Sequence, residues 1–217
     1  MTANPRHFAH CSAEELRLFK ALNRPEKIQD FLNALPINFE EAGETCMSPR
    51  RVIREQKAHC LEGALFAAAA LWFHGKPPLL MDLKTTADDE CHTVTLFERG
   101  GSWGAISHTN HAVLRYREPV YRTLRELALS YFHEYFLDDG RKTLRSYSRA
   151  VNLSRINPAW LTAERDLWEI DALLDRTAHY PLVTPATARL LRRADPIEIE
   201  AGKIVVWKDR YVSGARP

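Results

Sequence analysis

The chain has 217 residues, of which 45% are hydrophobic, so it can bury a sizeable core as one domain. Lysine and arginine number 30 and aspartate and glutamate 28, a balance that excludes the charge pattern of a nucleic-acid binder. No apolar run approaches the ~20 residues of a membrane span, and segment 1–7 lacks the apolar core of a secretory signal, so we expect a cytoplasmic protein.

Helical patterns predict three helices in the first third of the chain. Ser12 opens a capping box that is followed by apolar residues at helical spacing. Pro25 suits the first turn of a second helix, which ends before Pro36. Ser48 begins a third helix that runs toward His59.

A run that is apolar nearly all round, from Cys60 to Phe73, predicts a core helix. Gly75 suits a left-handed cap, and Pro77-Pro78 prevents the helix from continuing. Cys60 is therefore expected at the N-terminus of the core helix.

Strand patterns follow the core helix. Residues 79–83 read as a buried strand and residues 85–90 as an exposed acidic loop. A hairpin is expected from strands 91–98 and 103–107, joined by a turn at Gly100-Gly101. Strand alternation points Cys91 away from the face that His92 occupies.

The second half of the chain is less regular. Apolar residues at helical spacing predict a long amphipathic helix over 119–137, and Thr162 begins another. Residues 143–153 and 197–207 read as extended segments.

This order of elements predicts an α+β fold rather than a doubly wound sheet. We expect one domain over residues 1–217, with a core at about 24–137 and helical and extended additions at about 138–217.

Cys60 and His92 indicate a function. Free N–H groups and the macrodipole at a helix N-terminus lower a thiol pKa from about 8.5 toward the ~3.5–7.5 of nucleophilic thiols. His92, at the head of the hairpin, can then act as the base. The alternatives are that Cys60 is a small inert core residue and that His92 is a strand histidine bonded to backbone. The cysteines show no CxxC spacing, so neither a redox pair nor a zinc ribbon is expected.

Cys60 at the head of its helix, His92 on one strand and Trp103 on the next resemble the transglutaminase-like superfamily. Segments 105–117 and 130–136 resemble more narrowly a bacterial branch of that superfamily whose activity is uncharacterised. The resemblance implies a papain-like fold in which a cysteine begins the core helix and a histidine and then an aspartate lie on successive strands.

The third catalytic position departs from that pattern. The superfamily has an aspartate four residues after the strand tryptophan, and here that residue is Ser107. A serine does not stabilise an imidazolium as a carboxylate does. Asn110 is the first candidate to orient His92 instead, and Asp82 and Asp89 are the alternatives. If none of them reaches His92, the site is a cysteine–histidine dyad or has lost its chemistry.

The leading hypothesis is a cysteine-dependent acyl-transfer enzyme without a cofactor, with Cys60, His92 and Asn110 as its catalytic residues. The substrate would be a peptide, a protein or a small amide, and hydrolysis is favoured over amine transfer because water is abundant. The backbone N–H of Cys60 would hold the oxyanion together with a side chain such as Gln56 or His59.

Two other functions remain open at this stage. Ser107 in place of aspartate favours a binding protein that keeps the fold and the cleft but has no activity. His108 and His111 could join His59, His92 and Cys60 in a zinc site, although their spacing matches no metal motif. Neither a nucleic acid nor a membrane is expected as a partner, and the sequence does not indicate an oligomeric state.

Overall fold

Four helices precede the sheet in the computed structural model, which describes residues 6–207. Ser12 and Ser48 cap the first and third helices and Pro25 occupies the first turn of the second, as the sequence predicts. The helices are α1 (Ala13–Ala21), α2 (Pro25–Ala34), α3 (Pro49–Glu55) and α4 (Cys60–Phe73). Helix α3 stops short of His59 because Gln56 adopts the left-handed conformation, with φ 52°.

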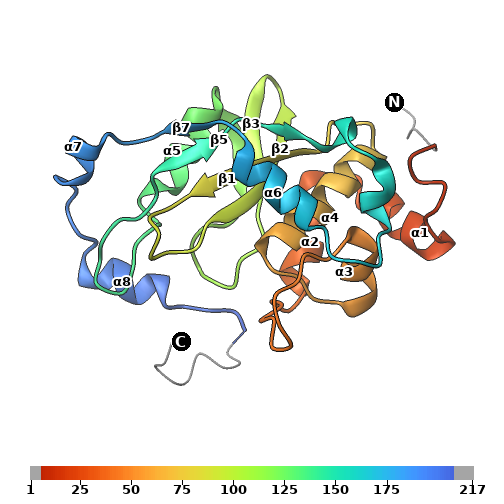
Figure 1. The fold of residues 1–217 in the computed structure, drawn as a ribbon, viewed down its shortest axis with the longest axis horizontal. Helices are drawn as coiled ribbons and strands as arrows, with labels where there is room; N and C mark the ends of the chain where they lie inside the picture. Colours follow the sequence, from red (N-terminus) through yellow and green to blue (C-terminus); the bar gives the residue numbers. More distant parts are fainter. Residues whose placement is uncertain (1–5, 208–217) are drawn as a thin grey trace.

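Helix α4 lies at the centre of the molecule. Its alanines and leucines leave no polar face, so the helix is buried from Leu61 through Leu71. Helices α1, α2 and α3 pack against it on one side, and the sheet packs against it on the other (Figure 1). The helix ends at Phe73, and Gly75 follows with φ 73°, which confirms the predicted left-handed cap.

Seven strands of the described residues form one sheet in the order β4-β3-β2-β1-β5-β7, and β6 also pairs with β1. Every pairing is antiparallel. Gly100 and Gly101 join β2 to β3 with φ 61° and 75°, the two-residue hairpin turn that needs positive φ at both positions. The fold is therefore α+β, as predicted. The strands are β1 (Leu79–Lys84), β2 (His92–Arg99), β3 (Ser102–Ile106), β4 (Arg117–Tyr121), β5 (Ser146–Ser148), β6 (Val151–Asn152) and β7 (His179–Pro181).

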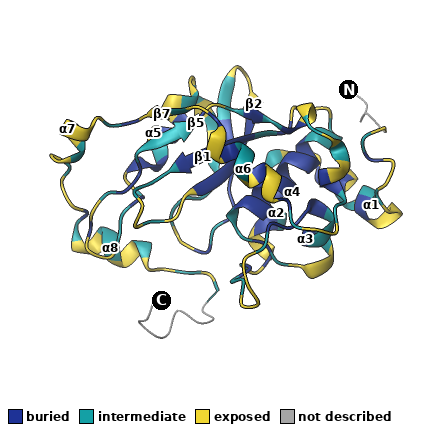
Figure 2. Ribbon diagram, in the orientation of Figure 1, coloured by how far each residue is buried: buried dark blue, intermediate teal, exposed yellow. Residues whose placement is uncertain are grey.

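The sheet separates the core into two layers. One face of β2 joins the α4 layer: Thr95 Oγ1 donates to the carbonyl of Ala64 at 2.6 Å, and Phe97 belongs to the same cluster as α4. The other face carries Val94 and Leu96, which pack with the buried side of α5 (Leu124–Phe132). In Figure 2 the dark blue of buried residues accordingly runs through α4 and the strands beside it.

The helix predicted over 119–137 is shorter than expected. Residues from Arg117 to Tyr121 form β4, because the edge of β3 offers them hydrogen-bond partners. Helix α5 begins only after Thr123, whose side chain forms a capping box with Glu126. The local cap and the free sheet edge therefore override the helical spacing of the first residues.

The C-terminal half adds short elements. Residues 143–153 contain β5 and β6, in agreement with the predicted extended segment. The prediction for 197–207 was wrong over its first part, because a capping box at Asp195 begins a helix there. Thr162 follows a 3₁₀ turn and caps no α-helix, since the next helix has Leu167 at its N-cap. These elements are η1 (Leu153–Arg155), η2 (Pro158–Leu161), α6 (Trp168–Arg176), α7 (Pro185–Ala188) and α8 (Pro196–Gly202).

Helix length bears on any membrane association. None of the helices in the described part of the chain is long and apolar enough to span a membrane.

Candidate active site

Cys60 is the first residue of α4. His59 is the N-cap, and its Nδ1 accepts from the backbone N–H of Leu61 at 3.3 Å. As the first helical residue, Cys60 has a backbone N–H without an intrahelical acceptor. The thiol therefore lies at the positive end of the helix dipole, as the sequence predicts.

Two imidazole rings flank the Cys60 thiol. Burial on its own would raise the pKa of Cys60, but hydrogen bonding to His59 and to His92, together with the charges of both rings, lowers it to about 5. The remaining thiols differ from it: burial raises the pKa of Cys11 to about 11 and of Cys46 to about 12. Cys60 is thus set apart electrostatically as a thiolate at neutral pH.

His92 reaches Cys60 because both residues begin their elements at the same end of the molecule. Helix α4 and strand β2 run side by side in the same direction, with Ala64 bonded to Thr95. His92 shares the face of Val94 and Leu96, on the α5 side of the sheet. Because His92 is the first residue of β2, its ring lies at the end of the sheet and can reach Cys60 on α4, the helix that covers the opposite face.

Ser107 orients the His92 ring. The Nε2 of His92 lies 2.7 Å from Ser107 Oγ, and the Ser107 hydroxyl donates its one proton to the carbonyl of Leu114. The serine oxygen must then accept from His92, so Nε2 carries the proton. Nδ1 is the nitrogen that is left to face Cys60 and exchange a proton with the thiol.

Ser107 and its acceptor are themselves held from two sides. The Gln29 side chain accepts from the Ser107 backbone N–H at 3.0 Å and donates to its carbonyl at 2.7 Å. Leu114 adopts a left-handed conformation with φ 61°, and its N–H donates to Glu134 Oε2 at 2.6 Å. A branched residue at positive φ is uncommon, and here it aims the Leu114 carbonyl at Ser107.

The three residues expected to orient His92 lie elsewhere. Asn110 donates to the carbonyl of Trp207 at 3.1 Å and accepts from its N–H at 2.8 Å, so its amide is used to hold the C-terminal segment. Asp82 pairs with His179 at 2.9 Å, and Asp89 accepts from Thr143. The role assigned to Asn110 is therefore corrected: Ser107, which sequence reasoning had set aside, is the partner of His92.

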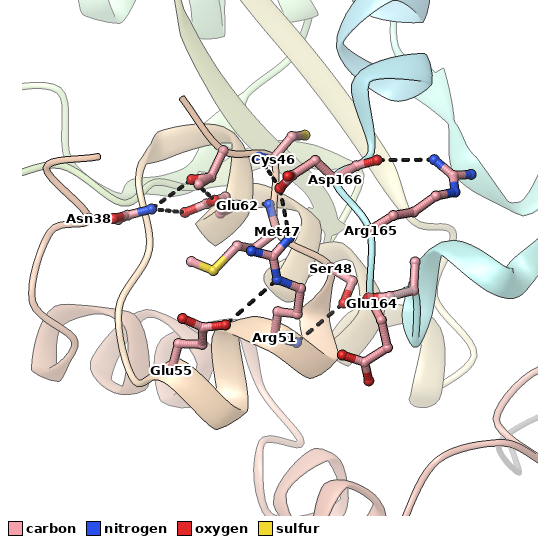
Figure 3. A network of polar contacts seen from close by, with 12 residues as sticks. Asn38, Cys46, Met47, Ser48, Arg51, Glu55, Glu62, Glu164, Arg165 and Asp166 are labelled. Atoms are coloured by element: carbon pink, nitrogen blue, oxygen red, sulfur yellow. Dashed lines mark hydrogen bonds and ion pairs between the residues drawn. The ribbon is translucent and has the colours of Figure 1, made fainter. Parts of the chain in front are cut away.

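Glu62 organises the residues around His59. Its carboxylate is fully buried and accepts from the backbone N–H groups of Met47 and His59, both at 2.9 Å. Thr45 and Asn38 donate to the same carboxylate from their side chains. Figure 3 shows Asn38 and Met47 beside Glu62 in this network. The loop 38–47 and the start of α4 are thereby joined through one carboxylate.

His59 responds to the two negative charges beside it. Its Nε2 lies 2.9 Å from the carbonyl of Thr45 and 3.4 Å from Glu62 Oε1. Burial would lower the pKa of His59, yet the hydrogen bond and charge of Cys60 and the charge of Glu62 raise it to about 9. The cap bond from Leu61 requires a neutral ring with an unprotonated Nδ1, so protonation of His59 removes that bond while it strengthens the pairing with the thiolate.

His108 and His111 do not join the thiol. His108 Nε2 lies 3.0 Å from the carbonyl of Ala58, and burial lowers the pKa of His108 to about 4. Its Cβ lies so close to α4 that a Cβ added to Gly63 would be 2.6 Å away, which explains a glycine in this helix. His111 Nδ1 lies 3.0 Å from the carbonyl of Gly202.

The donor groups of a metal site do not converge here. Within residues 6–207, no three His, Cys, Asp or Glu side chains are arranged to hold a metal ion. The zinc site considered from the sequence therefore has no supporting donor set in the described chain.

Gln56 and Cys91 also lie outside the arrangement around Cys60. Gln56 is exposed and donates to the carbonyl of Ile53, so it is not placed as an oxyanion donor. Cys91 is exposed and lies 3.9 Å from Thr85 Oγ1.

No model of a known protein family matches this chain, and no curated protein matches its sequence. The geometry of the residues around Cys60 is therefore what supports a function. Sequence reasoning did not find Gln29 or Leu114, because their parts in the site come from a contact 78 positions away and from a backbone conformation.

Proposed function

We propose that this protein is a cysteine-dependent acyl-transfer enzyme, and in the first place a hydrolase of peptides or amides. The observation that carries the proposal is the Cys60 thiol at a helix N-terminus, in hydrogen-bonding contact with His92, whose other nitrogen is held by Ser107. The nucleophile thus contacts the base, and the base contacts the group that orients it, as covalent catalysis requires.

The proposed reaction begins with attack of the Cys60 sulfur on a carbonyl carbon. His92 first holds the thiolate through Nδ1 and then protonates the leaving amine as the tetrahedral intermediate collapses. Water attacks the resulting thioester, and His92 takes up one of the water protons. The C–S bond then breaks, which releases the carboxylic acid and returns Cys60 as the thiolate. An amine in place of water would give transfer instead of hydrolysis, with the same residues in the same roles.

We extend the proposal to the family that the sequence resembles. In the transglutaminase-like superfamily a cysteine at the start of the core helix meets a histidine on a neighbouring strand. The order of Cys60 on α4, His92 on β2 and Ser107 directly after β3 supports this relationship. The serine would replace the usual aspartate as a neutral acceptor, so the imidazolium would rely on the thiolate for its countercharge.

The test is the pH dependence of alkylation by iodoacetamide, followed by mass spectrometry at each cysteine in wild type and in His92→Ala. We expect a midpoint near 5 at Cys60 in wild type and a higher midpoint in the variant, because loss of the ring removes one of the two groups that lower the pKa. Cys91, which is exposed and whose pKa is raised by burial of its sulfur, serves as the internal reference in the same samples.

A midpoint near 8.5 at Cys60 in both proteins would contradict the proposal. The binding protein without activity would then be the better interpretation of the fold.

A further inference from the structure

A second oxyanion donor is missing from the arrangement described so far. The backbone N–H of Cys60 supplies one donor, and Gln56 is turned away. The His59 ring already has partners within the protein, since it hydrogen bonds to Cys60 and its Nε2 faces the carbonyl of Thr45. An acyl-transfer site gains much of its rate from donors aimed at the developing oxyanion, so a further donor is expected near the thiol.

Tyr135 offers such a donor. Its side chain is only 4% exposed, and among residues 6–207 its hydroxyl is one of four buried side-chain polar atoms without a hydrogen-bond partner. A buried hydroxyl with no partner costs free energy and is rare in folded proteins. The contrast is Tyr131 on the same segment, whose hydroxyl donates to the carbonyl of Arg115 at 3.1 Å.

The contacts of the segment around Tyr135 lead to the residues that hold His92 and to the loop that precedes it. The preceding residue, Glu134, holds the N–H of Leu114, whose carbonyl accepts from Ser107. The carbonyl of Tyr135 accepts from Thr143, which in turn donates to Asp89 in the loop before His92. The ring belongs to the hydrophobic cluster on the α5 face of the sheet, which is the face of His92.

Electrostatics agree with this placement. Burial is the largest cause that raises the pKa of Tyr135 well above its usual range, and the charge of Cys60 is the next. The hydroxyl therefore stays protonated and remains a donor across the pH range in which the thiolate exists. Its proton is not given to the sulfur, because the hydroxyl makes no hydrogen bond in the resting site.

We propose that Tyr135 is a catalytic residue that donates its hydroxyl hydrogen bond to the carbonyl oxygen of the substrate. This inference rests on the proposed acyl transfer. When the Cys60 sulfur bonds to the carbonyl carbon, the π electron pair moves to the oxygen. Tyr135 and the backbone N–H of Cys60 hold that oxyanion until the pair returns and the bond to the leaving group breaks. Tyr135 keeps its proton throughout.

The experiment compares two reactions of the same thiol. Acylation by p-nitrophenyl acetate passes through an oxyanion and releases p-nitrophenolate, whereas alkylation by iodoacetamide displaces iodide and forms no oxyanion at carbon. Rates of both are measured at Cys60 in wild type and Tyr135→Phe, with Tyr131→Phe as the matched control and His92→Ala as the control for the thiolate.

We expect acylation to fall about 100-fold in Tyr135→Phe, while alkylation keeps its rate and pH midpoint within about twofold. Tyr131→Phe should leave the ratio of the two rates unchanged, since its hydroxyl has a structural partner. Equal acylation in Tyr135→Phe and wild type, or a parallel fall of both reactions, would overturn the role of Tyr135 alone. A wild-type Cys60 that neither acylates nor depends on His92 would overturn the acyl-transfer proposal as well.

Thermal unfolding separates the role from a folding defect. Because the Tyr135 hydroxyl has no partner, its removal should leave the melting temperature unchanged or raise it, whereas Tyr131→Phe should lower it. A lowered melting temperature in Tyr135→Phe would show that the hydroxyl has a structural partner and would contradict the assignment.

Discussion

Ser107 stands where a carboxylate would be expected, and its hydrogen bonds show what a neutral residue can do there. It fixes the tautomer of His92 and the orientation of the ring, because its own proton is committed to Leu114. It supplies no charge to an imidazolium. The countercharge in this site comes from the Cys60 thiolate and, on the side of His59, from Glu62.

Exchange of Ser107 for alanine tests that role. Ser107→Ala removes the acceptor of the His92 Nε2–H, and hydrogen bonds to charged groups contribute roughly 1.5–3 kcal/mol. We therefore expect the midpoint of Cys60 alkylation to rise by about 1–2 pH units and alkylation at pH 5 to slow by about tenfold. Stopped alkylation followed by peptide mass spectrometry measures both quantities.

Asn110→Ala is the matched control, since Asn110 binds Trp207 and not His92. It should lower the free energy of unfolding by about 1–2 kcal/mol and leave the midpoint of Cys60 unchanged. A shift of the midpoint in Asn110→Ala that equals the shift in Ser107→Ala would contradict this division of roles.

At the scale of the elements, the contacts of its first turn fix the position of α4. The helix begins with a capping box between His59 and Glu62, and Glu62 also binds the loop 38–47 (Figure 3). The same loop reaches the C-terminal half, because the N–H of Cys46 donates to Asp166 at 2.9 Å and Arg51 pairs with that carboxylate at 2.7 Å. The position of the thiol thus rests on contacts far apart in the sequence.

Glu62→Gln should destabilise this element. The four groups that hydrogen bond to the carboxylate are all donors, two at each oxygen, so the amide group of glutamine would face a donor in either orientation. We expect the free energy of unfolding in urea to fall by about 2–3 kcal/mol. Glu55→Gln on α3 is the control, since Glu55 is partly exposed and its ion pairs with arginines should contribute less than about 1 kcal/mol. Equal stability of Glu62→Gln and wild type would show that the network is not stabilising.

Local signals account for most elements but not for their lengths. Caps at Ser12 and Ser48, the proline at the start of α2 and the two glycines of the hairpin each specify a helix start or a turn from neighbouring residues alone. The start of α5 was misjudged because residues 117–121 find partners on β3, a contact that helical spacing cannot reveal.

At the scale of the whole molecule, the protonation of Cys60 and His59 makes the free energy of unfolding depend on pH. A thiol whose pKa falls to about 5 on folding stabilises the folded state fully above the unfolded pKa of about 8.5, and this contribution is lost as the pH falls toward 5. His59, with its pKa raised to about 9, stabilises fully below 6.5 and loses its contribution as the pH rises through 9. Between pH 6.5 and 8.5 the two trends oppose each other.

Between pH 5 and 6.5 the thiol dominates the pH dependence, because folded His59 stays protonated and unfolded His59, with a pKa near 6.5, loses its proton only toward the upper end. The difference in free energy of unfolding between wild type and Cys60→Ala should rise with pH across this window, by at most about 2 kcal/mol. Urea titrations at several pH values measure it. A difference that stays constant from pH 5 to 6.5 would mean that Cys60 is not ionised in the folded protein.

The sequence by itself determined that a cysteine begins a buried helix and that a histidine begins the first strand of a hairpin. Capping residues, an unbroken apolar run and a glycine pair specify these features over short distances. Only the tertiary structure decided which residue orients His92 and which buried tyrosine hydroxyl lacks a partner. Those outcomes depend on Gln29 holding Ser107, on the left-handed turn at Leu114 and on the packing of Tyr135, contacts between segments distant in the chain.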